Sequence, residues 1–235
     1  MTITAIILAH YKQRQNNLKI IIDSLLAGSF VPKEIVVFID NDEIDFQDHR
    51  VTIIRTSASF LPKIRFALGS YFDTDYCLFI DDDLTVRKNT LRNLCVNALD
   101  INDDKAIIGL QGSILGDTPN PYADDTSIKR EDRKRIEVDI VLRTYFVPRA
   151  SMSYGLQLQA ENTQLPDISL DDVYLCLGNK YLNNGHNYVI GVNDENNVSE
   201  LSEHSVGQSM TGEHYENRNK VTRYLMDKYV IPSTK

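Results

Sequence analysis

Three consecutive aspartates end an apolar stretch and are the strongest indication of chemistry in the chain. Asp81, Asp82 and Asp83 directly follow the apolar residues 76–80. A short apolar run is typical of a buried strand, and an open α/β sheet binds ligands at the carboxyl ends of such strands. Three neighbouring carboxylates repel one another and need a compensating cation, for which a hard divalent ion such as Mg²⁺ or Mn²⁺ is suited. The alternative is a solvated strand end, or a cap for a helix beginning near Lys88, although one acidic residue would suffice for a cap.

Polar residues also follow other apolar stretches, where further strands are expected to end. Together with the aspartates they form four groups: His10 with Tyr11, Asp40 with Asn41, Asp81 to Asp83, and Asp171 with Asp172. The strand ends of a doubly wound sheet converge, so groups far apart in the sequence can meet at one site. Asp171 and Asp172 could instead cap a helix, because Asp is a favoured N-cap residue.

The chain has no glycine-rich loop that could hold phosphate groups through backbone N–H groups. Neither a GxxxxGK[ST] run nor a GxGxxG run follows the apolar residues 3–9. A nucleotide bound at these strand ends would therefore have its diphosphate held by a metal ion and basic side chains.

Strands and helices are expected to alternate up to the aspartates. Apolar runs predict strands over residues 3–9, 34–39, 51–55 and 76–80, and helical spacing predicts helices over residues 16–27 and 60–71. The first helix is expected to end at Gly28. Strand, helix and strand in succession form a βαβ unit, so this part is expected to be a doubly wound half-domain of the nucleotide-binding type.

The residues after the aspartates predict a continuation of the same architecture. Helices are expected over residues 89–99, 171–182 and 213–229, and strands over residues 106–110 and 138–147. Residues 116–135 are polar and highly charged, which indicates either a mobile loop over the site or an ordinary surface loop. Residues 194–202 are expected to be a polar linker. The last helix is expected to have an apolar face formed by Tyr215, Val221, Leu225 and Met226.

The composition favours one acidic globular domain. The chain has 235 residues, 42% of them hydrophobic, and a formal net charge of −8. This length suffices for one sizeable α/β domain, whereas two would be cramped. The negative charge argues against general nucleic-acid binding, which needs clustered Lys and Arg, although a local basic groove around residues 129–135 stays open.

The cysteines and the first residues indicate a soluble protein of a reducing compartment. Cys77, Cys95 and Cys176 are few and far apart, so they form neither a disulfide framework nor a zinc site. The first residues have no basic leader region, and their apolar run is too short to span a bilayer. These features predict a cytoplasmic protein without a membrane span.

The ordered set of polar groups resembles that of the GT-A nucleotide-sugar glycosyltransferases with their DxD motif. The resemblance rests on Ala9-His10-Tyr11-Lys12 after the first strand, Asp40-Asn41 after the second, and the aspartate triplet. Later segments are most similar to the exostosin-type transferases at three places: Ile107-Ile108-Gly109, Ser169-Leu170-Asp171-Asp172-Val173, and Leu201-Ser202 followed by His214-x-x-x-Arg218.

The resemblance covers nearly the whole chain and implies a fold for it. Residues 1–235 would form a single GT-A domain, an α/β fold with a doubly wound, mostly parallel sheet flanked by helices and a smaller acceptor-side subregion. Residues 1–100 would be the nucleotide-binding half. Residues 101–235 would be the acceptor-binding half with a C-terminal closing segment.

The resemblance also implies roles for individual residues. Asp83 would be the main metal ligand, and Asp81 would support the metal or contact the ribose. The other nucleotide-binding residues would be His10, Tyr11, Arg14, Asp40, Arg65 and Asp82, with Arg65 reaching the diphosphate. Asp172, with Asp171 beside it, would lie near the anomeric carbon, and Arg218 would close over the diphosphate. His204 and His214 are candidates for a third metal ligand, although a lone histidine in a polar segment is more often structural.

These residue types suit glycosyl transfer from a nucleoside-diphosphate sugar. The transition state gains positive charge on the sugar and negative charge on the leaving diphosphate, which a carboxylate and a cation respectively stabilise. The expected enzyme is a hexosyl- or N-acetylhexosaminyltransferase that uses Mn²⁺ or Mg²⁺ and moves a sugar, most simply from a UDP-sugar, to a glycan hydroxyl. Exostosin-type enzymes would retain the anomeric configuration, whereas Asp172 acting as a base would invert it.

Other functions fit parts of the pattern. Residues 79–85 also match the hhhDxDxT motif of haloacid-dehalogenase-like phosphatases, in which Asp81 would be the nucleophile and Asp83 the acid. That fold normally starts with the aspartate strand, whereas here other strands precede it. A nucleotide-sugar-binding module without catalysis is a further alternative, because a fold alone does not establish activity. A nucleotidyltransferase is disfavoured by the missing glycine-rich loop.

Overall fold

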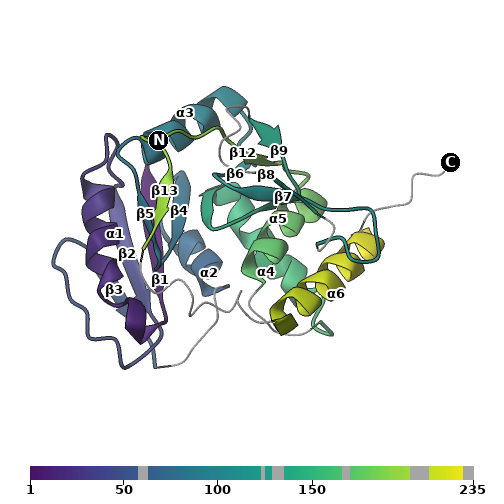
Figure 1. Ribbon diagram of the computed structural model, residues 1–235, viewed down its shortest axis with the longest axis horizontal. Coiled ribbons are helices and arrows are strands. Elements are labelled where there is room, and N and C mark those ends of the chain that lie inside the picture. The colour runs from purple at the N-terminus through teal and green to yellow at the C-terminus, as the bar shows by residue number, and fades with distance from the viewer. Residues whose placement is uncertain (58–62, 123–124, 129–134, 166–169, 202–211, 230–235) are drawn as a thin grey trace.

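The main sheet is built around β1 (Ile3–Ala9), a strand whose seven residues are all buried. The computed structural model describes residues 1–57, 63–122, 125–128, 135–165, 170–201 and 212–229 of the chain, and Figure 1 shows its ribbon. β1 pairs in parallel with β2 (Glu34–Ile39) on one side and with β4 (Tyr76–Asp81) on the other. These three strands have the continuous apolar sequences that burial on both faces requires.

The other elements surround this parallel centre. The main sheet also contains β3 (Thr52–Arg55), β6 (Ile107–Gly109), β9 (Ile136–Glu137), β11 (Thr144–Pro148) and β12 (Asn187–Val189). Two small sheets are formed by β5 (Leu84–Val86) with β13 (Val198–Glu200), and by β7 (Gly112–Ile114) with β8 (Thr126–Ile128) and β10 (Ile140–Val141). The helices are α1 (Asn17–Leu26), α2 (Ile64–Tyr71), α3 (Thr90–Ile101), α4 (Met152–Ala160), α5 (Asp171–Leu182) and α6 (Gly212–Tyr229), with the 3-10 turns η1 (Lys12–Arg14) and η2 (Arg149–Ser151).

The main sheet is mostly parallel. Its strand order is β3-β2-β1-β4-β11-β6-β12-β9. Within the described part of the chain, four of its seven neighbouring pairs are parallel, and β11 lies antiparallel between β4 and β6. Because β11 runs the opposite way, its amino end lies at the same edge as the carboxyl ends of β1, β2 and β4.

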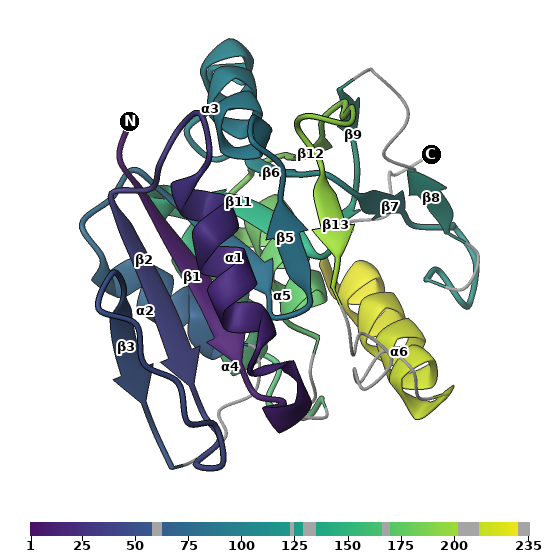
Figure 2. The same cartoon turned by 60° about the vertical axis from the view of Figure 1, so that its left-hand side comes forward.

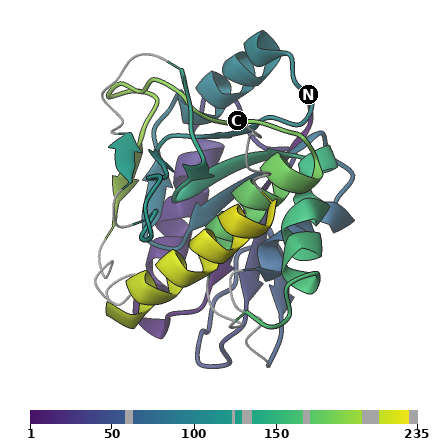
Figure 3. The ribbon, with the colours of Figure 1, turned by 90° about the vertical axis from the view of Figure 1, so that its right-hand side faces the viewer.

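Each face of the sheet carries its own apolar core. Successive side chains of a strand point to opposite faces, so Ile7 of β1 packs with the apolar sides of α1 and α3, whereas Ile6 packs with residues of α2, α4, α5 and α6. Figure 2 shows α1 in front of the sheet, with α2 and α4 behind it. In Figure 3, α6 runs obliquely alongside α4 and α5 on the second face. The expected α/β fold with a mostly parallel sheet flanked by helices is therefore observed.

Several predicted elements are confirmed, and others differ. The strands over residues 3–9 and 34–39 and the helix over residues 171–182 have the predicted bounds. The strand predicted over residues 138–147 is wrong, because the chain turns at Arg143, whose φ is 67°, and splits into β10 and β11. β13 lies within the predicted linker, β8 lies within the predicted loop over residues 116–135, and α4 was not predicted.

The buried stripe of α6 also differs from the prediction. Val221 and Leu225 are buried as expected, but Tyr215 is 51% exposed. Arg218 and Thr222 complete the stripe instead, at helical spacing from the two apolar residues. Arg218 can be buried because it is paired with an aspartate of α5.

The cysteines lie in the core, as expected. Cys77, Cys95 and Cys176 are free and buried, and burial raises the pKa of Cys95 to about 11. No helix within the described ranges is both long and apolar enough to cross a membrane. The cytoplasmic location and the division into a nucleotide-binding and an acceptor-binding half stay predictions.

Gly155 of α4 and Gly178 of α5 allow the two helices to pack closely, and this contact provides a test of the fold. A Cβ at Gly178 of α5 would lie 2.5 Å from the backbone oxygen of Tyr154, which cannot easily move. Overpacking costs about 1–3 kcal/mol, and the helix propensity of Ala offsets about 1 kcal/mol of it. Gly178→Ala is expected to lower the free energy of unfolding by up to about 2 kcal/mol in urea titrations.

The matched control is Ser153→Ala on the exposed side of α4, which is expected to change that free energy by less than about 0.5 kcal/mol. A Gly178→Ala variant that is more stable than the wild type would contradict the close packing of the two helices.

Candidate active site

The carboxyl ends of three parallel strands bring the predicted site residues together. Leu8 of β1 lies beside Asp81 of β4, and Ala9 lies beside Ile39 of β2, so the polar residues that follow these strands share one edge of the sheet. The arrowheads of β1, β2 and β3 point to this edge in Figure 2. The convergence expected from the sequence is therefore observed for the first three strand ends.

Asp82 is held by a buried arginine. The Nη1 of Arg14, in η1, donates to Asp82 Oδ1 at 2.6 Å, and both side chains are only 6% exposed. Asn17 of α1 donates to the backbone oxygen of Asp82 at 3.1 Å. Burial raises the pKa of Asp82 to about 6, and the adjacent guanidinium opposes this shift. This ion pair gives Arg14 and Asp82 a structural role in the aspartate loop, and their predicted contact with a nucleoside stays a prediction.

Asp83 lies between several charges. Arg14 Nη2 is 3.1 Å from Asp83 Oδ2, and the backbone N–H of Leu201 donates to the Asp83 carbonyl oxygen at 2.7 Å. Burial and then the negative charge of Asp81 raise the pKa of Asp83, whereas Arg14 and Arg143 lower it. Asp83 is thus a carboxylate whose ionised form is disfavoured by a neighbouring carboxylate, as expected of a cation-binding pair.

Arg65 connects the aspartate loop to α5. This buried side chain donates from Nη1 to Asp81 Oδ1 at 3.0 Å, and its Nε lies 3.4 Å from Asp171 Oδ2. Arg65 Nε and Asp171 Oδ2 have no hydrogen-bond partner among the described residues, so the contact between them is purely electrostatic. Burial raises the pKa of Asp171 to about 6, followed by an opposing effect of Arg65.

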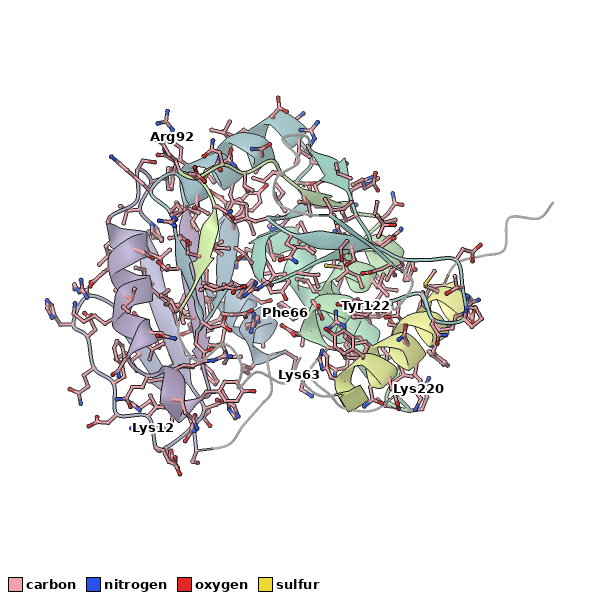
Figure 4. All side chains as sticks on the ribbon, viewed as in Figure 1. Lys12, Lys63, Phe66, Arg92, Tyr122 and Lys220 are labelled. Atoms are coloured by element: carbon pink, nitrogen blue, oxygen red, sulfur yellow. The ribbon has the colours of Figure 1, made fainter. Side chains whose placement is uncertain are left out.

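Asp172 forms a bidentate ion pair with an arginine of α6. Arg218 of α6 donates from Nη1 and Nη2 to the two oxygens of Asp172 at 2.9 Å and 2.5 Å. The guanidinium carbon of Arg218 lies 4.1 Å from the centre of the Tyr122 ring, and Figure 4 shows Tyr122 beside α6. Burial raises the pKa of Tyr122 to about 12. Because both oxygens of Asp172 accept from Arg218, this guanidinium fixes the orientation of the carboxylate.

The end of β1 is tied to the end of β2. His10 Nδ1 and Asp40 Oδ1 are 2.8 Å apart, and the Asn41 side chain donates to the His10 carbonyl oxygen at 2.8 Å. The Asp40 side chain is buried, whereas His10 is 40% exposed. Tyr11 packs edge-on against His10 and lies under the guanidinium of Arg14. The exposed faces of His10 and Tyr11 are suitable positions for the predicted nucleoside contacts.

Tyr145 and Arg143, for which the sequence predicted no charge-based role, also contribute to the site. The Tyr145 ring of β11 is buried beside Arg65, and burial together with Asp171, Asp172 and Asp81 raises its pKa well above the usual value. The charge of Arg143 lowers the pKa of Asp83, and the Arg143 side chain forms an ion pair with Glu200 of β13. No periodicity or motif marks Arg143, because its place depends on the turn between β10 and β11.

The aspartate loop is compatible with a divalent ion that has few protein ligands. Among the described residues, no group of three or more His, Cys, Asp and Glu side chains could hold a metal ion. The negative charge of Asp81 nevertheless raises the pKa of Asp83, and the Asp81 side chain remains 31% exposed. Mg²⁺ is commonly bound by one or two carboxylates together with substrate phosphates and water. The donor set therefore fits an ion that arrives with a diphosphate.

The two histidines named as further ligands are placed differently. His214 of α6 is partly buried, and burial and the charge of Arg218 lower its pKa. His204 lies outside the described residues, as do Ser169, Ser202 and most of the basic stretch 129–135.

Comparisons with known proteins bear on the fold. No protein-family profile and no curated protein sequence matches the chain. A crystal structure of S. aureus TarS 1–349 in complex with UDP-GlcNAc is similar to it, with a TM-score of 0.61 over 98% of this chain and 68% of that one. The chain shares the fold of TarS.

Two further crystal structures of S. aureus TarS agree. One of TarS 1–349 gives a TM-score of 0.58 over 100% of this chain and 67% of the TarS chain, at 15% identity. The other gives 0.52 over 82% of this chain and 37% of the TarS chain, at 14% identity. The complex with UDP-GlcNAc is also 15% identical, so the likeness to TarS shows a common fold, and it confirms the fold class expected from the sequence.

The buried pair of Arg14 and Asp82 can be tested by its effect on stability. Arg14→Ala leaves Asp82 buried without its cation, which costs about 3–5 kcal/mol when one partner of a buried pair is removed. We expect a corresponding loss in the free energy of unfolding at pH 7, measured with urea, and partial recovery in Arg14→Ala/Asp82→Asn.

Arg149→Ala provides the control, because Arg149 pairs with Asp73 on the surface at the other edge of the sheet. Its effect is expected to be small. If Arg14→Ala destabilises the protein no more than Arg149→Ala, the buried pair does not hold the aspartate loop.

Proposed function

We propose that the protein is a metal-dependent glycosyltransferase that moves a sugar from a nucleoside-diphosphate sugar to an acceptor hydroxyl. The observation that carries the proposal is the meeting of Asp81, Asp171 and Asp172 around the buried Arg65 and Arg218, with Asp83 held beside them by Arg14, at one edge of the sheet. The shared fold supports it, because the similar TarS structure is a complex with UDP-GlcNAc. UDP-GlcNAc is therefore the first donor to test, and a glycan hydroxyl is the proposed acceptor.

The charge of the site supports the need for a divalent ion. Six aspartates (Asp40, Asp81, Asp82, Asp83, Asp171 and Asp172) and three arginines (Arg14, Arg65 and Arg218) give a formal charge of −3, to which the pair of Arg143 with Glu200 adds none and in which His10 is not counted. Lys12 and Lys63 lie near this edge (Figure 4) but do not cancel that charge. A diphosphate adds further negative charge, so its binding needs a cation.

The residues of the chain have distinct proposed roles. Asp83 and Asp81 would hold Mn²⁺ or Mg²⁺, which when bound supplies positive charge against the leaving diphosphate. His10, Tyr11 and Asp40 would hold the nucleoside. Arg65 fixes Asp81 relative to Asp171, so it sets the position of the metal-binding loop relative to α5.

Asp171 and Asp172 are proposed to act at the reacting carbon. Their carboxylates would stabilise positive charge on the sugar, and Asp172, held in place by Arg218, would accept the proton of the acceptor hydroxyl. Direct displacement of this kind inverts the anomeric configuration. The exostosin-type resemblance instead predicts retention, and the NMR coupling constant of the product's anomeric proton distinguishes the two.

Calorimetric titration with UDP is the primary test. We expect binding in the presence of Mn²⁺, its loss with EDTA, and its loss in Asp83→Ala, because the diphosphate then lacks its cation. Asp73→Ala, at the opposite edge of the sheet, should bind UDP like the wild type. Release of UDP from UDP-GlcNAc and transfer to glycan acceptors are then measured.

Other outcomes favour the alternatives. Hydrolysis of a phosphate ester without UDP binding, lost in Asp81→Asn, would favour the phosphatase. Metal-dependent UDP binding without transfer or hydrolysis of any nucleotide sugar would favour a binding module.

The pKa of Asp171 predicts an acidic limit of activity. As the pH falls through about 6, Asp171 takes up a proton and loses the charge proposed to act near the sugar, so kcat/KM for transfer is expected to fall. Because burial raises this pKa above that of the unfolded chain, proton uptake by Asp171 favours the folded state. Activity should therefore fall while thermal unfolding, followed by circular dichroism, shows no loss of stability from this group. A rate that is constant down to pH 5 would contradict this role of Asp171.

A further inference from the structure

Arg143 has an unusual backbone conformation. Among the described residues that are not glycine, those with positive φ are Asn102, Arg143 and Asn184. Asn102 and Asn184 follow the helices α3 and α5, and asparagine tolerates the left-handed region better than most residues. Arginine has no such tolerance, so its φ of 67° is imposed by the surrounding structure.

The strain comes from a tight turn between β10 and β11. The N–H of Thr144 donates to the carbonyl oxygen of Leu142 at 2.8 Å, across Arg143 alone, and with a positive φ this is the rare and strained form of the γ-turn. Gly109 of β6 makes room for the turn, because a Cβ there would lie 2.8 Å from the Thr144 carbonyl oxygen. Local strain of this kind is found preferentially at functional sites.

The turn delivers a positive charge to the carboxyl edge of the sheet. Thr144 is paired with Ile80, the residue before the aspartates, so Arg143 comes directly beside the loop that they form. Its guanidinium acts on Asp83 electrostatically. Its Nη1 donates to Glu200 of β13 at 2.5 Å.

Arg143 differs from the other arginines of the site in its partner and its exposure. Arg14, Arg65 and Arg218 have side chains that are 5–6% exposed and paired with buried aspartates. The side chains of Arg143 and Glu200 are 28% and 44% exposed. An exposed ion pair contributes little stability, so exchange of Glu200 for another anion costs little.

We propose that Arg143 binds the diphosphate of the donor and that Glu200 holds its guanidinium until the donor arrives. This inference rests on the proposed function. A guanidinium suits bidentate contact with phosphate oxygens, and its fixed backbone reduces the freedom lost on binding. The carboxylate of Glu200 would compete with the diphosphate for Arg143.

Titration calorimetry with UDP and with uridine, in the presence of Mn²⁺, tests the proposal. Arg143→Asn removes the guanidinium and keeps a side chain that accepts a positive φ. It is expected to weaken UDP binding about 10- to 100-fold, the loss typical of a charged hydrogen bond, and to leave uridine binding unchanged. Arg143→Lys should restore part of the affinity, and Arg149→Ala should have no effect.

Glu200→Gln separates phosphate binding from a structural role. We expect it to tighten UDP binding, because the competing charge is gone. If the Arg143–Glu200 pair serves only to hold β13 in place, Glu200→Gln and Arg143→Asn will both weaken the binding of UDP and of uridine to a similar extent. That result would overturn the proposal.

Failure of the two proposals can be told apart. Wild-type protein that binds no UDP would overturn the proposed function and, with it, the role of Arg143. If the wild type binds UDP and Arg143→Asn binds it equally tightly, only the role of Arg143 is overturned.

Discussion

Charge compensation at the carboxyl edge of the sheet is the constraint on which the rest of the site depends. The strand ends and α5 bring aspartates into positions where water is largely excluded, and an unpaired buried carboxylate is strongly destabilising. The fold supplies guanidiniums from three different elements: Arg14 from η1, Arg65 from α2 and Arg218 from α6. Each of these elements must therefore dock with its arginine in place, and the buried stripe of α6 includes Arg218 for this reason.

This arrangement separates two kinds of cation at the site. The buried arginines cannot lose their protons and are engaged with aspartates, so they hold the carboxylates in fixed positions. The positive charge that neutralises an incoming anion has to come from groups that are not paired with a buried aspartate. The exposed Arg143 and a divalent ion are proposed for this role. Under this proposal the exposed pair of Arg143 with Glu200 would respond to ligands differently from the three buried pairs, although all contain an arginine and a carboxylate.

Much of the fold could be predicted because its central elements have local patterns. β1, β2 and α5 have the predicted bounds, since continuous apolar runs and helical spacing are visible within a short window. The pairing of β5 with β13 could not be predicted, because these strands are short, partly polar and distant in the sequence. Clustering of the aspartates was inferred from the topology of strand ends. The partners of Arg14 and Arg143 were not, because they depend on side chains that meet only after the strands have assembled.

The ion pair between Asp172 and Arg218 also has a consequence for the order in which the chain can fold. Its partners are 46 residues apart, and Arg218 lies in the last described helix. During synthesis, Arg14 and Asp82 are both available early, whereas Asp172 emerges well before its guanidinium. Before α6 docks, the carboxylate of Asp172 stays hydrated only if the amino end of α5 is open to solvent. We therefore expect docking of α6 to be coupled to closure of the second apolar core around Asp172 during folding.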